Sequence, residues 1–364
     1  MNEKVSIITV VYNGADTIEQ TIQSVLGQTY KNIEYIIIDG ASTDGTQEII
    51  GKYQNRIAYF ISEKDKGIYD AMNKGIEHAT GDVIGIINSD DWYEIDAVEK
   101  AVSTLNKYEA DVIYGRIFCG ARPEEMSLVP IYLLETLWYH MAISHPSVFV
   151  KKSIYDIYGL FNIKYKIAAD YELMLRLYSN NVKFAFIDEV LAYFRTGGIS
   201  QTLMYEMYME EFSIACEYIG RCENRKEVMK ILSQTGEHVV FNYELEKNPF
   251  VLSELLNNYF SADVSNIVIF GTGKWGIKCY YTLQNTNINI EYFIDNHKSE
   301  QALFGKKIRK PDDIIPGNKY ILIAVANDTD EIVNQLKDLG EKNYVTIGRL
   351  RRELWDERRN IIGL

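Results

Sequence analysis

The sequence predicts an α/β protein with a doubly wound, mostly parallel sheet, followed by a helical connector and a second, smaller α/β unit. Strand-like runs of β-branched residues alternate with helical patterns through residues 4–91. The same alternation returns after residue 262, behind a long stretch whose pattern is helical throughout. The expected domains are residues 1–200, a connector at 201–261, residues 262–348 and a basic amphipathic tail at 349–364.

Four strands are expected at the N-terminus, each followed by a polar or glycine-containing loop. Buried parallel strands are typically rich in valine and isoleucine, and these runs have that composition. Glycine and polar residues end each run and start a helix. The strands are expected at 4–12, 33–38, 57–61 and 83–87, and the helices at about 17–26, from 46, and at 69–79.

Acidic residues stand at three of the expected strand ends: Asp39, Asp65 and the pair Asp90 and Asp91. Open α/β sheets bind ligands at the carboxyl edge of their strands. Two adjacent carboxylates repel each other, so they favour a nearby cation, and hard divalent ions prefer oxygen ligands. The pair could instead cap a helix that starts near Glu94. Three acids on one edge favour the ligand interpretation.

The next stretch loses the strict alternation. Strands are expected at 111–118, 144–150, 183–187 and 190–194, and a helix opens at 168–172, which contains Asp170. His145 precedes one of these strands, where it is either structural or part of an acceptor site. The cluster 138–140 is aromatic and either stacks on a sugar or packs in the core.

A glycine pattern, Gly271-X-Gly273-X-X-Gly276, follows an expected strand and opens a helix, and Asp295 ends the next strand. That context is the one which a dinucleotide fingerprint requires. These four residues are therefore a candidate second nucleotide site in a Rossmann-like unit. The alternative is that the glycines only serve a tight turn. A Tyr-X-X-X-Lys pair does not follow, so a complete sugar dehydratase or epimerase is not expected.

Composition restricts the function classes. A net charge of −13 argues against a nucleic-acid binder. No apolar run approaches the ~18–20 residues of a membrane span. The N-terminus lacks the pattern of a signal peptide, and the four cysteines lack metal-site spacing, so we expect a cytoplasmic protein with reduced thiols.

The tail and the connector leave two interactions open. Apolar side chains of the tail share one helical face: Leu350, Leu354, Trp355, Ile361 and Ile362. That face either docks on its own domain or makes peripheral contact with the inner membrane face. The connector is a candidate surface for a homodimer.

Residues 1–200 resemble the family-two inverting glycosyltransferases, which use nucleotide sugars, have the GT-A fold and often build bacterial surface polysaccharides. Four ordered motifs carry the resemblance: Ile7–Asn13, Ile37–Thr46, Ser62–Gly75 and Asn88–Asp91. The second unit is similar to small nucleotide-binding domains of polysaccharide pathways, through Ile269–Gly273, Phe293–Asn296 and Ile323–Asn327.

For the donor, the resemblance implies that Tyr12 stacks on the nucleobase, with Thr9 in the same motif. It further implies that Asp39 and Asp65 bind the polar edge of the base, with Lys66 nearby. In the Ser89-Asp90-Asp91 element, Asp90 would meet the ribose and Asp91 the metal ion, Mn²⁺ or Mg²⁺. The first position of this element is serine rather than aspartate, which leaves fewer carboxylates for the ion.

For the acceptor side, the resemblance implies that Asp170 is the catalytic base, with Glu172 as its rival. His145 and the turn 197–200, including Gly198, would lie near the acceptor or the diphosphate. One base opposite the leaving group suffices for direct displacement with inversion, and the metal ion would neutralise the charge that develops on the diphosphate.

The expected function is therefore transfer of a hexosyl or N-acetylhexosaminyl group from a UDP-sugar to a glycan hydroxyl. The expected acceptor is a lipid-linked oligosaccharide for surface-polysaccharide synthesis. A non-catalytic sensor or scaffold that binds a nucleotide sugar is the alternative. A hydride-transferring enzyme built on the C-terminal glycines is a more distant one.

Overall fold

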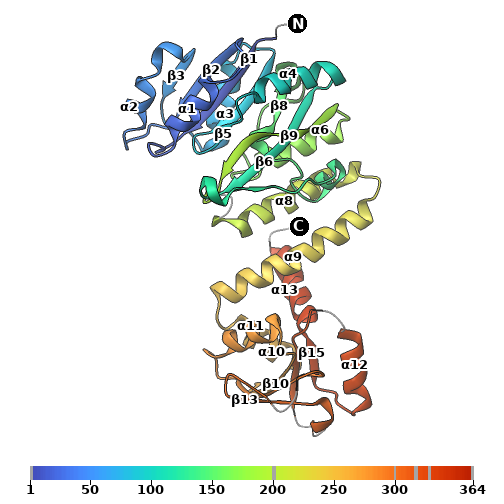
Figure 1. Cartoon of the computed structure of the whole chain (residues 1–364). Helices are drawn as coiled ribbons and strands as arrows, with labels where there is room; N and C mark the ends of the chain where they lie inside the picture. The colour runs from blue at the N-terminus through green and yellow to red at the C-terminus, as the bar shows by residue number, and fades with distance from the viewer. Residues whose placement is uncertain (1–2, 199–201, 299–300, 315–318, 327–328, 362–364) are drawn as a thin grey trace. The chain divides into compact units, whose positions relative to one another are not determined.

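The computed structural model of the chain describes residues 3–198, 202–298, 301–314, 319–326 and 329–361 (Figure 1). The chain forms two compact units, Met1–Lys230 and Ile231–Leu364. Their boundary falls inside helix α9 (Arg225–Lys247). The stretch predicted as one connector is therefore divided, with α8 (Met204–Tyr218) in the first unit and α10 (Val251–Phe260) in the second.

The sheet of the first unit has the strand order β3-β2-β1-β4-β8-β6-β9-β5, with β7 paired to β6. Its first four strands are parallel: β1 (Val5–Val11), β2 (Ile33–Asp39), β3 (Tyr59–Ser62) and β4 (Val83–Asn88). The others are β5 (Trp92–Tyr93), β6 (Val112–Gly120), β7 (Ser127–Leu128), β8 (Phe149–Lys151) and β9 (Phe184–Arg195). Strand β8 runs against β4 and β6, while β6 and β9 are parallel. The prediction of a mostly parallel, doubly wound sheet is confirmed.

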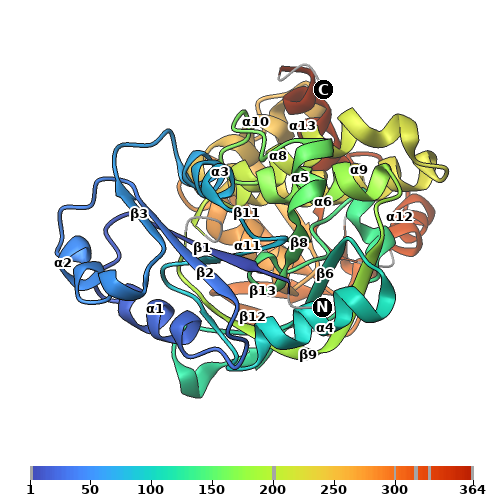
Figure 2. The same ribbon diagram turned by 90° about the horizontal axis from the view of Figure 1, so that it is seen from above.

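Side chains of β1 alternate between two cores, one on each face of the sheet. Ile8 and Val10 pack with residues of α3 (Ile68–His78), and Ile7 packs with residues of α1 (Ile18–Leu26). Figure 2 shows β1 and β2 with α1 on one side and α3 on the other. Because every residue of β1 is buried, its register is strongly fixed, and so is the position of its carboxyl end.

Within its described residues, the first unit contains four further α-helices and five 3₁₀ helices. The α-helices are α2 (Thr46–Gly51), α4 (Ala97–Tyr108), α5 (Lys152–Tyr158) and α6 (Ala169–Ser179). The 3₁₀ helices are η1 (Gln54–Arg56), η2 (Pro123–Glu125), η3 (Leu134–Trp138), η4 (His145–Ser147) and η5 (Ile219–Arg221).

Three local predictions differ from the structure. The strand expected from 144 begins only at Phe149, because Pro146 lacks the N–H group that a ladder needs and η4 takes its place. The two strands expected at 183–187 and 190–194 form one strand, β9. The helix-cap interpretation of Asp90 and Asp91 is wrong, since both lie in the turn between β4 and β5 and α4 begins at Ala97.

The second unit contains a sheet with the order β12-β13-β11-β10-β14-β15. Its strands are β10 (Asn266–Phe270), β11 (Asn289–Ile294), β12 (Ala302–Leu303), β13 (Lys306–Arg309), β14 (Tyr320–Ile323) and β15 (Tyr344–Thr346). All but β12 are parallel. The sequence did not predict β12 or β13, because β13 is polar and buries only Ile308. The remaining helices are α11 (Lys274–Leu283), α12 (Thr329–Asp338), η6 (Pro311–Asp313) and α13 (Ile347–Ile361).

The apolar face of the tail helix α13 packs on its own unit. Leu350, Leu354 and Trp355 are buried, and the Trp355 ring lies within 2.6 Å of where a Cβ on Gly236 would be. The structure therefore shows that these tail residues pack on their own unit, as one of the two interpretations of the tail predicted. Ile362 lies outside the described residues. Within the described parts, no helix is long and apolar enough to cross a membrane.

Candidate active site at the carboxyl edge of the first sheet

Loops that follow β1, β2, β3 and β4 meet at one edge of the first sheet, because these four strands are parallel. Two glycines mark the closest approaches. A Cβ on Gly14 would lie 3.0 Å from Ser89 Oγ, and a Cβ on Gly40 would lie 2.7 Å from Asp65 Oδ2. The Tyr12 ring also lies 3.4 Å from that second position. The structure thus brings together Tyr12, Asp65 and the turn that carries Asp90 and Asp91.

Hydrogen bonds lock the loops after β1 and β2 to each other. Ser42 Oγ accepts from the Asn13 N–H at 2.7 Å, and Asn13 Oδ1 accepts from the Thr43 N–H at 2.9 Å. Asn13 and Ala41 both have left-handed backbone angles, with φ of 50° and 65°. Non-glycine residues rarely adopt this conformation, and where they do the surrounding contacts must hold them. The shape of this edge is therefore preorganised.

Asp39 lies beneath this edge rather than on its surface. It is fully buried, and its carboxylate accepts from the Ser42 N–H, from the Ser42 hydroxyl and, at 2.5 Å, from Ser62 Oγ. Both carboxylate oxygens thus have partners within the chain. The residue holds the loop in place, which differs from the direct nucleobase contact expected from the sequence.

The remaining donor-side residues divide into exposed and buried ones. Tyr12 is 68% exposed, so its ring is open to a ligand. Asp65 is half-buried and accepts from the Gly67 N–H, and Lys66 is exposed. Thr9 is different: it is fully buried in β1, and its hydroxyl accepts from Tyr35 at 3.0 Å. The structure does not bring Thr9 to the site.

Asp91 has an unusual environment for an acid. Its side chain is fully buried, Oδ1 accepts from the Arg195 N–H at 3.0 Å, and Oδ2 has no hydrogen-bond partner among the described residues. Burial and the charge of Asp90 raise the pKa of Asp91 well above its usual range, and burial raises the pKa of Asp90 as well. An unpaired buried carboxylate is costly, so this oxygen fits a cation or a donor supplied by a ligand.

A metal ion at Asp91 would depend on the substrate for most of its ligands. Among the described residues, no group of three or more histidine, cysteine or acidic side chains is arranged to hold an ion. Near Asp91, the side-chain oxygen of Asn88 is a second buried atom without a partner there. One carboxylate oxygen supplemented by substrate phosphates is a normal arrangement for Mg²⁺ or Mn²⁺, so the residues fit such an ion.

Sequence reasoning missed Arg195, which ends β9 beside the acid pair. Its Nε donates to the Asp90 carbonyl at 3.2 Å, its Nη2 donates to Gln20 at 2.8 Å, and its guanidinium lies over the Trp92 ring. Among the described residues, Arg195 is the only arginine whose guanidinium contacts the turn that carries Asp90 and Asp91. Strand β9 runs in the same direction as β6 and β4, so its carboxyl end lies at the same edge of the sheet. A basic residue at that strand end could therefore have indicated a cation beside the acid pair.

Asp170 stands at the start of α6 and is joined to the same region through Tyr69. The Tyr69 hydroxyl lies 2.9 Å from Asp170 Oδ1 and 2.6 Å from the Ile167 carbonyl oxygen, and its single proton serves one of them at a time. Burial and the charge of Asp170 raise the pKa of Tyr69 well above its usual range, so the hydroxyl remains a donor. Tyr69 is the second residue of α3, which follows the loop of Asp65 and Lys66. Asp170 Oδ2 accepts no hydrogen bond from any described residue.

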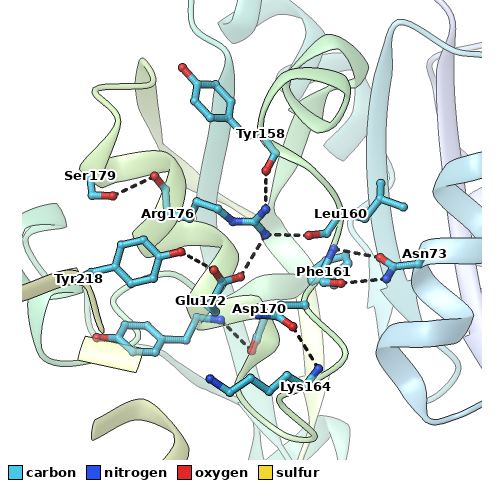
Figure 3. Close-up of polar contacts among 12 residues, drawn as sticks. Asn73, Tyr158, Leu160, Phe161, Lys164, Asp170, Glu172, Arg176, Ser179 and Tyr218 are labelled. Atoms are coloured by element: carbon cyan, nitrogen blue, oxygen red, sulfur yellow. Dashed lines mark hydrogen bonds and ion pairs between the residues drawn. The ribbon is translucent and has the colours of Figure 1, made fainter. Parts of the chain in front are cut away.

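Glu172, the alternative candidate for the base, has a structural role, because both of its carboxylate oxygens have partners within the chain. Its side chain is buried, Oε2 pairs with Arg176 Nη2 at 3.0 Å, and Oε1 accepts from the Tyr218 hydroxyl at 2.5 Å (Figure 3). Arg176 also donates to the carbonyl oxygens of Tyr158 and Leu160. This cluster ties α6 to α8 and to the loop after α5, and it leaves Asp170 as the acid that can take up a proton.

Of the predicted acceptor-side residues, His145 is the one that the structure places near Asp170. His145 is partly buried in η4, where burial lowers its pKa against the opposing charge of Asp170, so the imidazole is neutral at pH 7. Gly198 is described but has no neighbour within 4 Å of a Cβ. Ile199 and Ser200 of the same predicted turn lie outside the described residues.

In the second unit, the glycine pattern forms a tight turn. Gly271 has a φ of 112°, and a Cβ on Gly276 would lie 2.0 Å from the Gly271 carbonyl oxygen. Asp295 accepts from the Thr272 hydroxyl and from the His297 and Lys298 N–H groups. Burial alone would raise the pKa of Asp295, but these hydrogen bonds lower it. Glycine is thus required here for the turn itself, and a nucleotide at this site remains a prediction.

Comparison with known families and proteins gives matches to both units. Residues 6–144 match the family described as glycosyl transferase family 2. Residues 263–347 match a family described as C2185-like, N-terminal. The first match contains the donor-edge loops after β1 to β4.

Two relatives show how far the similarity extends. A PGL/p-HBAD biosynthesis glycosyltransferase of Mycobacterium bovis is 26% identical over 217 residues, which are 58% of this chain and 84% of that protein. An uncharacterised glycosyltransferase of Mycobacterium tuberculosis is 35% identical over 179 residues, or 47% of this chain and 68% of that protein.

Among solved structures, S. aureus TarS 1–349 has a TM-score of 0.52 at 18% identity, covering 71% of this chain and 78% of that one. At that identity the similarity concerns the fold. Taken with the family match and the relatives, it establishes the nature of the first unit: the chain belongs to glycosyltransferase family 2, is a glycosyltransferase and has the GT-A type of fold.

Proposed function

We propose that the first unit is an inverting, metal-assisted glycosyltransferase that moves a sugar from a UDP-sugar to a hydroxyl of a glycan acceptor. The observation that carries the proposal is the unpaired, buried Asp91 Oδ2 at an edge that also presents the exposed Tyr12. Asp170 is connected to the same edge through Tyr69. Charge-binding and proton-accepting groups thus stand on different elements of one unit.

The donor would lie across the loops after β1, β3 and β4. Tyr12 stacks on the nucleobase, Asp65 accepts from its polar edge, Lys66 lies nearby and Asp90 meets the ribose. Asp39 acts indirectly, by fixing the loop at Gly40. UDP as the nucleotide is supported by the structures of S. aureus TarS 1–349 in complex with UDP and with UDP-GlcNAc, whose fold this unit resembles.

Asp91 would hold the divalent ion, Mn²⁺ or Mg²⁺, through Oδ2. When bound, such an ion stabilises the negative charge that develops on the departing diphosphate. The protein contributes the position of that oxygen, which the backbone N–H of Arg195 fixes from the other side of the carboxylate. The Arg195 guanidinium adds a second positive charge beside the acid turn.

Asp170 would act as the general base. Its Oδ2 takes the proton of the acceptor hydroxyl while the hydroxyl oxygen attacks the anomeric carbon and the bond to the diphosphate breaks. The electron pair leaves on the diphosphate, so one displacement inverts the anomeric configuration. The Tyr171 N–H donates to Oδ1 at 2.9 Å, and the Tyr69 hydroxyl lies 2.9 Å from the same oxygen, so these contacts hold the carboxylate in orientation.

The acceptor proposed from the family resemblance is a lipid-linked oligosaccharide at the inner face of the membrane. His145 and Gly198 would lie on its side of the site. A non-catalytic sensor that only binds the nucleotide sugar is the competing function. The available Asp170 oxygen favours the enzyme, because a protein that only binds the nucleotide sugar does not need a proton acceptor.

The test is release of UDP from a panel of UDP-sugars by the full chain, with Mn²⁺ or Mg²⁺ and with EDTA. We expect release that EDTA abolishes and that one sugar favours. Asp170→Asn should abolish release but retain UDP-sugar binding in calorimetry. Binding without release by the wild-type protein, with either metal and with glycan acceptors added, would favour the sensor. Lost binding in a folded Asp170→Asn variant would contradict the role of Asp170.

For the second unit we propose an assembly role rather than a nucleotide site, since its turn uses Gly271, Gly276 and Asp295 internally. Equilibrium dialysis of radiolabelled UDP, ATP and NAD against the full chain should give at most one site per chain. A second site that Gly273→Ala removes would restore the nucleotide interpretation.

A further inference from the structure

Helix α6 begins without a capping side chain of its own. The residue before it, Ala168, has no polar side chain that could accept a hydrogen bond from the helix start, and no side-chain cap is present. N–H groups at a helix start have no partner within the helix, so their acceptors must come from elsewhere. Asp170, the base proposed above, is the second residue of α6. Whatever holds the start of this helix therefore also holds the base.

Glu210 of α8 supplies acceptors at this point. Its Oε1 accepts from the Lys166 N–H at 2.8 Å, and its Oε2 accepts from the Ile167 and Ala168 N–H groups, both at 2.9 Å. No other described residue accepts from these three N–H groups. A carboxylate at the N-terminus of a helix is also favoured by the helix dipole. One half-buried side chain thus binds three successive N–H groups that directly precede α6.

Helix α3 contacts the same segment through Tyr69. The Tyr69 hydroxyl lies 2.6 Å from the Ile167 carbonyl oxygen and 2.9 Å from Asp170 Oδ1. The N–H group of Ile167 is therefore held by α8, while its carbonyl oxygen lies beside α3. Because one hydroxyl lies beside both this carbonyl and the base, a shift of residues 166–168 changes the surroundings of Asp170 directly.

The earlier part of the loop before α6 is held without α8. Asn73 of α3 exchanges two hydrogen bonds with the backbone of Phe161, at 2.9 and 3.0 Å (Figure 3). Loss of the Glu210 carboxylate would therefore release residues 166–168 while the loop stays anchored at Phe161. The part of the loop that depends on Glu210 is the part next to the base.

We propose that Glu210 is a positioning residue for the transfer reaction: its carboxylate fixes the three residues before α6 and, through them, the orientation of Asp170 toward the acceptor hydroxyl. The inference rests on the proposed role of Asp170 as the base. Glu210 itself takes no proton and touches no substrate in this role. A base must lie within hydrogen-bond reach of the proton that it accepts, and a misplacement of about 1 Å can lower the rate by roughly 10²-fold.

The test is the kinetics of UDP release by the full chain, with Glu210→Ala as the main variant. We expect kcat to fall about 100-fold, because the segment before α6 loses all three acceptors and Asp170 is no longer held in place. KM for the UDP-sugar should stay unchanged, since the loops at the donor edge are held by hydrogen bonds of their own. A loss of UDP-sugar affinity as large as the loss of kcat would contradict this role.

Glu217→Ala is the matched control on the same helix. Glu217 also joins α8 to this loop, but it does so through side chains, with Lys164 Nζ at 2.6 Å and the Tyr165 hydroxyl at 2.8 Å. The control should keep the wild-type kcat, even if it lowers thermal stability as much as Glu210→Ala does. Hydrogen exchange of the amides at 166–168 should accelerate in Glu210→Ala alone. If the two variants have the same kcat, the α8 contact is merely structural and the inference is wrong.

Two further variants separate the possible failures. Normal UDP release by Asp170→Asn would overturn the base assignment and this inference with it. An inactive Asp170→Asn together with a wild-type kcat in Glu210→Ala would overturn the role of Glu210 alone. If Glu210→Ala does not fold, Glu210→Gln takes its place, because the amide keeps one acceptor oxygen for the segment. A kcat below the wild-type value with unchanged KM would then support the inference, and a wild-type kcat would overturn it.

Discussion

The two units place an acid at the carboxyl edge of a parallel sheet and treat it in opposite ways. In the first unit, Asp91 is fully buried and one of its oxygens has no partner among the described residues. In the second unit, Asp295 accepts two hydrogen bonds from its own loop and one from Thr272 in the glycine turn. The sequence pattern is similar in both. What distinguishes a candidate ligand site from a structural turn is whether the chain itself satisfies the carboxylate.

Replacing the unsatisfied acid should have the largest effect. We expect Asp91→Asn to lower UDP release by roughly 10²–10³-fold, the scale for removing a group that stabilises transition-state charge. Its thermal stability should not fall, because a costly buried charge has been removed. A coupled UDP assay and a thermal melt measure both, and a variant with more than a tenth of wild-type activity would contradict the metal-binding role.

Asp39 is a buried acid of the first unit whose carboxylate, unlike that of Asp91, accepts hydrogen bonds on both oxygens. Asp39→Ala leaves the Ser42 and Ser62 donors unpaired and should cost about 3 kcal/mol of local stability, since hydrogen bonds to charged groups contribute about 1.5–3 kcal/mol each. Hydrogen exchange of residues 39–46 should accelerate accordingly. If exchange there stays as slow as in the wild-type protein, Asp39 does not hold the loop.

Asp295→Asn should have a smaller effect, confined to the second unit. We expect a loss of about 1–2 kcal/mol, because the amide oxygen keeps some of the hydrogen bonds but not their charge. Faster hydrogen exchange at 295–298 and at the Gly271 turn would report it. UDP release should stay at the wild-type level, and a tenfold loss would show that the second unit takes part in the reaction.

The smallest expected effect concerns how the stability of each unit changes with pH, because the two units should respond in opposite directions. Hydrogen bonds lower the pKa of Asp295 below its ordinary 3.8, so it stabilises the second unit above that pH, and this contribution is lost as the pH falls through the folded-state pKa. Burial raises the pKa of Glu211, on α8 of the first unit, from 4.5 to about 8, so the folded first unit binds the extra proton and loses stability as the pH rises through that window.

Hydrogen exchange of each unit at pH 3.5, 6 and 8.5, corrected for intrinsic rates, measures this difference. The wild-type protein should show both responses. Asp295→Asn should remove the loss of stability of the second unit at low pH, and Glu211→Gln should remove the loss of stability of the first unit at high pH. Parallel responses of the two units in the wild-type protein would mean that the two carboxyl groups do not differ in this way.

Much of the fold could be predicted because it follows from local patterns. Runs of valine and isoleucine with glycine or polar ends mark β1, β2 and β4 to within one or two residues. Strand β13 could not be predicted, since a polar edge strand is defined by its partner β11 and not by its own composition. The split of the connector at α9 likewise depends on which surface each helix covers.

The candidate site could be predicted only in part. Tyr12, Asp65 and the Asp90–Asp91 turn follow from strand order, because parallel strands deliver their ends to one edge. The same motifs predicted that Thr9 and Asp39 contact the donor. In the structure, both side chains are buried and form hydrogen bonds within the chain, Thr9 with Tyr35 and Asp39 with Ser62. Arg195 and Tyr69 were missed, because their roles depend on partners far away in the sequence: Arg195 contacts Asp91 from β9, and Tyr69 contacts Asp170 at the start of α6.

The sequence by itself therefore determined the order of elements, the edge at which acids gather and the family to which those motifs belong. Only the tertiary structure decided which acids are satisfied: Asp39, Glu172 and Asp295 have donors, whereas Asp91 and Asp170 each keep an oxygen without one among the described residues. The physical reason is that a motif fixes the position of a carboxylate along the chain, while its hydrogen bonds come from partners that folding brings to it.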